Sequence, residues 1–221
     1  MSLEIWFKME EDIAIVNQNT RISYIKNFFK KNTKKILVLL AVTLIILLFF
    51  FALDEFNKRK KNKFAEVYNN IVFNDDKYSQ LEIKDKMIEI INGKVDTYST
   101  LSLYYLIDNK IIVNDNEIDN LFDKVISINK DSELKNLVIF KKGLYFSDKY
   151  NENELLEILS PVINSESIWS QHALLLMADF YFHNKQFNKS KEFLQKIIGL
   201  KKVNTKIKIE VEKRLNRDFS E

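Results

Sequence analysis

The chain has 221 residues, of which 46% are hydrophobic and 29% are charged, and its net charge is +3. Because it contains no Cys, disulfides, thiolate metal sites, nucleophilic thiol chemistry and a lipid anchor on an N-terminal Cys are excluded. It has only three Gly and one Pro, and this scarcity of turn residues disfavours sheet folds and predicts an all-α protein of long helices.

Two polar segments precede the most apolar part of the chain. Residues 1–19 are polar with scattered apolar side chains, and we expect them to be loosely ordered. In residues 20–35, apolar side chains recur at helical spacing among basic ones, which predicts a short basic amphipathic helix. This helix either lies on the membrane surface, where it would favour anionic headgroups, or is only the flank that stops transfer of a following span.

Residues 36–53, ILVLLAVTLIILLFFFAL, contain no charge, and Thr43 is their only polar residue. As a helix they would extend about 27 Å, which matches the hydrocarbon thickness of a bilayer. A cleavable signal peptide is the alternative, but its apolar region is usually shorter and ends in a small-x-small site. Here Asp54, Glu55 and Phe56 follow, so the sequence predicts an uncleaved transmembrane helix.

The orientation of this helix is only weakly determined by charge. Six basic residues lie in residues 21–35 and five lie in residues 54–68, so the positive-inside rule leans slightly toward a cytoplasmic N-terminus and an exported domain. Residues 54–221 carry 27 basic and 27 acidic residues, and a neutral domain lacks the charge expected of a nucleic-acid binder.

After the apolar segment, apolar residues recur at intervals of three and four, and breaks rich in Asn, Asp and Ser separate the periodic stretches. This pattern predicts helical hairpins. The expected helices are 57–74, 77–92, 96–109, 115–129, 132–148, 151–164, 166–184, 186–199 and 203–217, and the strongly charged last one would cap the domain.

An internal repeat is visible in these helices. A small residue precedes Tyr by three positions in Ala65/Tyr68, Ser102/Tyr105 and Ala178/Tyr181, whereas Val138/Lys141 lacks both residues. The second helices share a frame that starts at Lys84, Ile118, Leu155 and Ser190, so the period is 34 to 37 residues. A helix–turn–helix unit of this length is typical of tetratricopeptide repeats, and a general antiparallel helical bundle is the alternative.

The layout also resembles a bacterial family, the single-pass ancillary Sec-translocon subunits (YfgM-like). The residues that carry the resemblance are the tail ending in RISYIKNFFKKNTKK, the single apolar span, the helices KNKFAEVYNNIV and DTYSTLSLYYLI, and the stretch IWSQHALLLMADFYFHNKQFNKSKEFLQKII. In the last stretch they are Trp169, Ala173, Met177, Ala178, Phe187, Ser190 and Leu194. The resemblance implies a domain exported to the periplasm that binds the translocon or assists newly exported proteins.

No catalytic, cofactor-binding or metal site is expected. His172 and His183 would lie on one helix face but about 16 Å apart along its axis, too far for one metal ion. We expect Asn74-Asp75-Asp76 and Asn114-Asp115-Asn116 to form turns and helix N-caps rather than calcium loops. The aromatic residues are expected in the core, or as peptide-binding anchors if a concave face exposes them: Tyr104, Tyr105, Trp169, Phe180, Tyr181 and Phe182.

We therefore expect residues 1–35 to be a short cytoplasmic tail, residues 36–53 a transmembrane helix, and residues 54–221 a tetratricopeptide-like α-solenoid in the periplasm. The expected function is a bacterial inner-membrane, chaperone-like adaptor at the Sec machinery, with translocon subunits or exported polypeptides as partners and no nucleic acid. The alternative is a structural scaffold of a cell-envelope or division complex. An enzyme is not expected.

Overall fold

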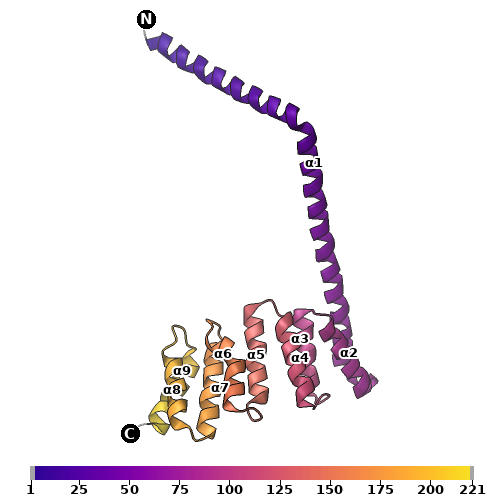
Figure 1. Ribbon diagram of the computed structural model, residues 1–221, viewed down its shortest axis with the longest axis vertical. Coiled ribbons are helices and arrows are strands. Elements are labelled where there is room, and N and C mark those ends of the chain that lie inside the picture. The colour runs from indigo at the N-terminus through magenta and orange to yellow at the C-terminus, as the bar shows by residue number, and fades with distance from the viewer. Residues whose placement is uncertain (1–2, 220–221) are drawn as a thin grey trace. The chain divides into compact units, whose positions relative to one another are not determined.

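The computed structural model describes residues 3–219 of the chain, with side chains from residue 22 onward (Figure 1). Within this range all regular structure is helical and no strand is present. The elements are α1 (Leu3–Phe73), the short 3-10 helix η1 (Asp75–Lys77), α2 (Gln80–Asn92), α3 (Asp96–Asp108), α4 (Asp115–Ile128), α5 (Ser132–Phe146), α6 (Glu152–Ile163), α7 (Ser170–His183), α8 (Phe187–Ile198) and α9 (Thr205–Asp218).

Helix α1 is continuous over 71 residues. The expectation that residues 1–19 are loosely ordered is therefore wrong for residues 3–19, and so is the expectation that a separate helix begins at residue 57. The physical reason is that no Gly or Pro occurs before Gly93, so nothing interrupts the backbone hydrogen bonds where the side chains change from polar to apolar and back.

The chain divides after Arg59 into two compact parts. The first consists, as described, of residues 3–59 of α1, and the last 14 residues of α1 belong to the second. The second, residues 60–219 as described, is called the helical domain below. In it each helix from α2 to α9 packs against the next one in sequence, and α5 also contacts α7.

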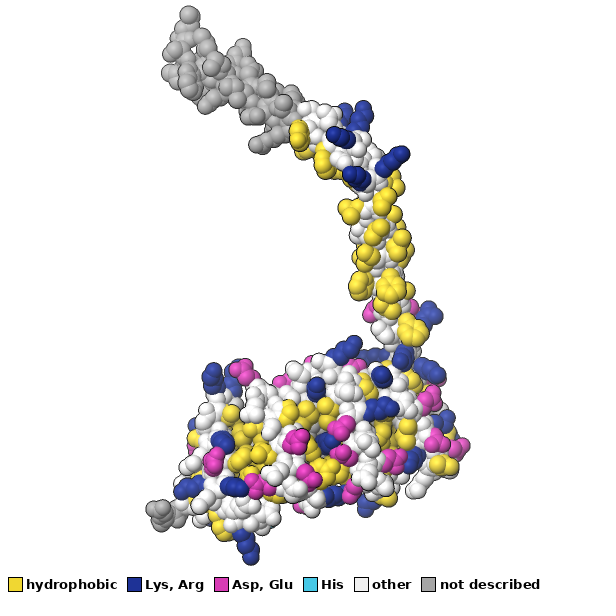
Figure 2. Space-filling model, viewed as in Figure 1, with side chains coloured by type: hydrophobic (Ala, Val, Ile, Leu, Met, Phe, Trp, Pro, Cys, Tyr) yellow, Lys and Arg dark blue, Asp and Glu magenta, His cyan; other side chains and the backbone are white. Residues whose placement is uncertain are grey.

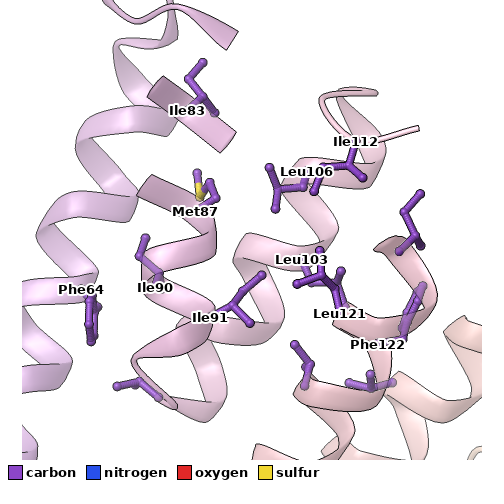
Figure 3. Close-up of a cluster of buried hydrophobic side chains, with 14 of the residues drawn as sticks. Phe64, Ile83, Met87, Ile90, Ile91, Leu103, Leu106, Ile112, Leu121 and Phe122 are labelled. Atoms are coloured by element: carbon purple, nitrogen blue, oxygen red, sulfur yellow. The ribbon is translucent and has the colours of Figure 1, made fainter. Parts of the chain in front are cut away.

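Two buried apolar clusters hold the helical domain together. The first joins the end of α1 to α2, α3, α4 and α5, and Figure 3 shows Phe64, Met87 and Leu103 among its members. The second joins α5 to α9 and includes Leu159, Met177 and Leu194, which are all 0% exposed. The core is therefore extended along the row of helices.

Every second helix of the domain begins at a regular interval, close to the predicted 34 to 37 residues. Helices α2, α4, α6 and α8 begin at residues 80, 115, 152 and 187, which are 35, 37 and 35 residues apart. The frame positions Ile118, Leu155 and Ser190 are fully buried, as the second helices of the hairpins require. Lys84 is the exception: it is half-buried and forms an ion pair with Glu117.

Helix α5 uses a small residue other than the one expected. A Cβ added to Gly143 would lie 2.5 Å from Leu159 Cδ2, so only Gly allows α6 to approach this closely. Phe146, three residues later, is 1% exposed. The pair of a small and an aromatic residue is thus present in α5 as Gly143/Phe146, five positions after Val138/Lys141.

Candidate functional sites: an apolar helical segment and a cleft

The apolar segment is residues 36–53 of α1, and nearly all of its large apolar side chains are exposed. An 18-residue window in this helix reaches a mean hydropathy of 3.3 with none of the window buried. Such exposure is opposite to that of a soluble core helix. Among the described residues this is the one helix long and apolar enough to cross a membrane.

The only polar side chain of the apolar segment is satisfied within the helix. Thr43 Oγ1 donates a hydrogen bond to the Leu39 carbonyl oxygen at 2.9 Å. The helix also pairs its own backbone groups, so no polar group in the segment requires water. This is the condition that a lipid environment imposes.

Basic residues flank the apolar segment on both sides. Arg59, four residues after Glu55, donates to its carboxylate at 2.7 Å and lowers the pKa of that carboxyl group. On the N-terminal side, no acidic residue occurs from residue 13 to residue 53. The orientation in a membrane is not decided by these contacts and stays a prediction.

A cleft of about 580 Å³ opens in the helical domain between the α5–α6 turn and the C-terminal half of α7. Leu176 and Phe180 form an apolar part of its wall. The ionisable residues around it are mostly acidic, and its lining includes Asp148, Tyr150, Glu152, Asp179 and His183. The cleft thus combines apolar surface with carboxylates.

Glu152, the first residue of α6, is held by three side chains of the following hairpin. Lys189 Nζ donates to it at 2.6 Å, Tyr181 Oη at 3.1 Å and Gln186 Nε2 at 3.3 Å. These hydrogen bonds, that of Lys189 first, lower the pKa of Glu152. Because its oxygens are engaged, Glu152 fixes one hairpin on the next rather than serving a ligand.

The other carboxylates of the cleft are more available. Asp179 forms an ion pair with Arg214 of α9 at 2.6 Å and is still 42% exposed, whereas Asp148 is exposed at the rim. Arg214 itself is only 13% exposed. A ligand in the cleft would therefore meet Asp148 and the open side of Asp179.

Replacement of Tyr181 by Phe is expected to weaken the loss of stability in alkali. Burial and then the hydrogen bond to Glu152 raise the pKa of Tyr181 to about 12 from 10 in the unfolded chain. The folded state thus holds this proton more tightly, so the stabilisation is complete below pH 10 and is lost as the pH rises toward 12. Urea unfolding measured between pH 9 and 12 should show a smaller decline for Tyr181→Phe.

Tyr24→Phe is the matched control, because Tyr24 is 79% exposed and lies outside the helical domain. It should leave the decline unchanged. A decline in Tyr181→Phe as steep as in the unmodified chain would contradict the assignment.

Of the six aromatic residues expected in the core or as anchors, only Tyr181 is fully in the core, at 2% exposure. The other five are half-buried. Tyr104 has a buried hydroxyl without a hydrogen-bond partner, and Lys141 Nζ lies 4.1 Å from its ring centroid. Phe180 lines the cleft, so it is the residue of this set that the structure places at a candidate site.

A cluster of three rings, Phe140, Trp169 and His172, joins α5 to the beginning of α7. The ring of Phe140 stacks on that of Trp169 with centroids 5.9 Å apart, and His172 lies 5.4 Å from Trp169. Burial lowers the pKa of His172. This histidine is thus a packing residue, while His183 lies at the cleft, and no group of three metal-binding side chains occurs among the described residues.

Asn114 forms the predicted side-chain N-cap of a helix, whereas Asn74 does not. Asn114 caps α4 as predicted, since its side chain accepts a hydrogen bond from the Glu117 N–H at 3.0 Å. Asn74 precedes η1 without a side-chain cap, and its amide donates instead to the Asn70 carbonyl oxygen at 3.2 Å.

The sequence did not single out Asp148, Asp179 or Leu176, because no motif marks them and they meet only through the folding of α5 onto α7. No family model, curated protein or solved structure matches the chain.

Proposed function

We propose that the chain is a single-pass membrane protein whose helical domain is a tetratricopeptide-like α-solenoid that binds protein partners. Residues 36–53 would be the membrane anchor, with the N-terminus in the cytoplasm and the helical domain in the periplasm. The observation that carries the binding role is the cleft, where Leu176 and Phe180 lie next to Asp148 and Asp179.

The contacts between successive hairpins support the repeat part of the proposal. Asp115 at the start of α4 accepts hydrogen bonds from Tyr145 and Lys149, just as Glu152 at the start of α6 accepts them from Tyr181 and Lys189. The same chemistry thus links two consecutive pairs of hairpins. Each hairpin buries its apolar face only against its neighbours, as in stacked repeats.

The cleft has the composition of a peptide-binding site. Apolar anchors in a concave surface provide most of the affinity in such sites, and a few polar groups set the orientation. Because the ionisable side chains at the cleft are mainly acidic, the preferred segment would combine apolar and basic side chains. The resemblance to ancillary Sec-translocon subunits suggests that the partners are translocon subunits or exported polypeptides.

Photo-crosslinking in cells tests the proposal. A photoreactive phenylalanine is placed at Phe180 in the cleft and, as a matched control, at Val113, which is 75% exposed in the turn before α4. Adducts with translocon subunits or exported chains that form from Phe180 and not from Val113 would support the adaptor function. A dual topology reporter after Glu221 establishes the compartment in the same strain.

Other results would overturn the proposal. A cytoplasm-active reporter would contradict the periplasmic location. Equal adducts from both positions, or none from Phe180, would contradict binding in the cleft, and adducts with envelope or division proteins from both positions would favour a structural scaffold.

A further inference from the structure

The part of α1 that precedes the apolar segment has two chemically different sides. One side, the apolar stripe, is exposed throughout and consists of Ile22, Ile25, Phe28 and Phe29. The other side, the lysine stripe, is also exposed throughout and consists of Lys26, Lys30, Lys31, Lys34 and Lys35. Figure 2 shows the two kinds of side chain on different sides of this part of the helix.

The separation of the stripes follows from the helical period. At 100° per residue, the apolar stripe covers about 120° of the circumference and the lysine stripe the adjoining 180° or so. A flank that only stops transfer needs positive charge but no sorted apolar side. The sorting is instead that of a helix that lies in the plane of a membrane surface.

Polar groups near the apolar stripe are satisfied within the helix. Asn32 Nδ2 donates to the Phe28 carbonyl oxygen at 3.0 Å, and Thr33 Oγ1 donates to the Phe29 carbonyl oxygen at 2.8 Å. These side chains therefore require little water. A Thr hydroxyl bonded in this way often bends a helix, and Thr33 lies just before residue 36, where a helix on the surface would have to turn into the bilayer.

The lysine stripe has no counter-charge nearby along the chain. The nearest acidic residues are Asp12 and Asp54, and Asp12 is 14 residues before Lys26, about 21 Å along a helix. Five neighbouring ammonium groups on one side repel each other unless anions approach them. At the end of a transmembrane helix, the anions that are always present are lipid phosphates.

We infer that residues 22–35 lie along the membrane surface, with the apolar stripe among the acyl chains and the lysine stripe on anionic lipid headgroups. This inference rests on the anchoring part of the proposed function and is independent of the cleft and its partner. The segment would position the chain in regions of membrane rich in anionic lipid.

Single-cysteine labelling tests the inference on the full chain, because the chain contains no Cys of its own. Spin labels are placed at Ile25, in the middle of the apolar stripe, and at Asn27, which projects about 160° away from it. Nanodiscs contain phosphatidylcholine with or without 30% phosphatidylglycerol. With phosphatidylglycerol, we expect the Ile25 label to be several-fold more accessible to oxygen and less accessible to a nickel chelate than the Asn27 label.

A label at Leu47 tests the membrane anchor separately from the surface helix. High oxygen accessibility at Leu47 shows that the apolar segment spans the bilayer, whatever happens at Ile25. If Leu47 is in the bilayer and the labels at Ile25 and Asn27 are equally exposed to the nickel chelate, the surface helix is wrong and the anchor stands. If Leu47 is exposed, the anchoring proposal itself fails.

Charge variants test the role of lipid phosphate. Replacing Lys26, Lys30 and Lys34 by Gln should abolish the effect of phosphatidylglycerol on the Ile25 label, and the matched Lys→Arg triple should retain it. Protection of Ile25 that is the same with and without phosphatidylglycerol would overturn the role of the lysines.

Discussion

Replacing Leu44 and Leu47 together by Arg is expected to release most of the protein from the membrane. Each Arg near the centre of a spanning helix is unfavourable by about 2.5–3.5 kcal/mol, and each lost Leu removes a favourable contribution of about 0.3–0.6 kcal/mol. The double substitution thus costs about 6–8 kcal/mol. The 15 Leu, Ile, Val and Phe residues of the segment favour insertion by about 5–9 kcal/mol in total. The cost of the two Arg residues therefore cancels most of the free energy that favours insertion.

The measurement is the distribution of the full chain between membrane and soluble fractions after alkaline extraction. Leu44→Ala with Leu47→Ala is the matched control, because Ala carries no charge and retains helix propensity, and it should stay in the membrane. An Arg variant that resists extraction as well as the control would contradict the assignment of residues 36–53 as the anchor. A single Leu47→Arg substitution should give an intermediate result.

The all-helical fold and the interval between hairpins were predictable because their causes are local. Apolar residues at intervals of three and four mark the buried side of each helix, and capping residues such as Asn114 and Asn151 mark where helices begin. The frame at Ile118, Leu155 and Ser190 follows from the same periodicity. These signals need no knowledge of what packs against the helix.

The continuity of α1 was not predictable from the change in polarity along it. Polarity determines the solvent that surrounds a helix, whereas a helix ends where the backbone is interrupted or capped. Between residues 3 and 73 neither Gly nor Pro occurs, and Lys35 and Glu55 at the two ends of the apolar segment are good helix formers. The absence of Gly and Pro was the feature of the sequence that predicts a single continuous helix.

The position of the close approach in α5 was missed for a different reason. The repeat interval, counted from Ser102, predicts the small residue of α5 at Val138. In the structure the close contact with α6 is at Gly143, because Leu159 of α6 packs against that position. Similarly, Tyr181 and Tyr104 look alike in the sequence, yet one is buried and the other is half-exposed beneath Lys141. The cleft also depends on contacts between residues that are distant in the sequence, such as Asp179 with Arg214.

Replacing both Asp119 and Asp123 by Asn is expected to be the most destabilising change of charge in the helical domain. Lys142 of α5 is only 5% exposed, and its ammonium group lies 2.8 Å from Asp119 Oδ1 and 2.5 Å from Asp123 Oδ1 of α4. Without these carboxylates the buried ammonium has no counter-charge, which costs about 3–5 kcal/mol. Asn retains the carbonyl acceptor for the Tyr150 hydroxyl, so the loss reflects charge rather than that hydrogen bond.

The measurement is equilibrium urea unfolding of the full chain in mild detergent, followed by circular dichroism. Since a domain is stable by about 5–15 kcal/mol in total, the double variant should lose a large part of its stability.

Lys142→Met separates the cost of an unpaired charge from the value of the ion pairs. In the otherwise unmodified chain it should change stability by less than about 1 kcal/mol, because Asp119 and Asp123 are 31% and 61% exposed and water can solvate them. Added to Asp119→Asn and Asp123→Asn, it should recover most of the lost stability, because no unpaired ammonium remains. If Lys142→Met instead destabilises as much as the two Asn substitutions and gives no recovery, the ion pairs themselves stabilise the α4–α5 contact, and the desolvation argument fails.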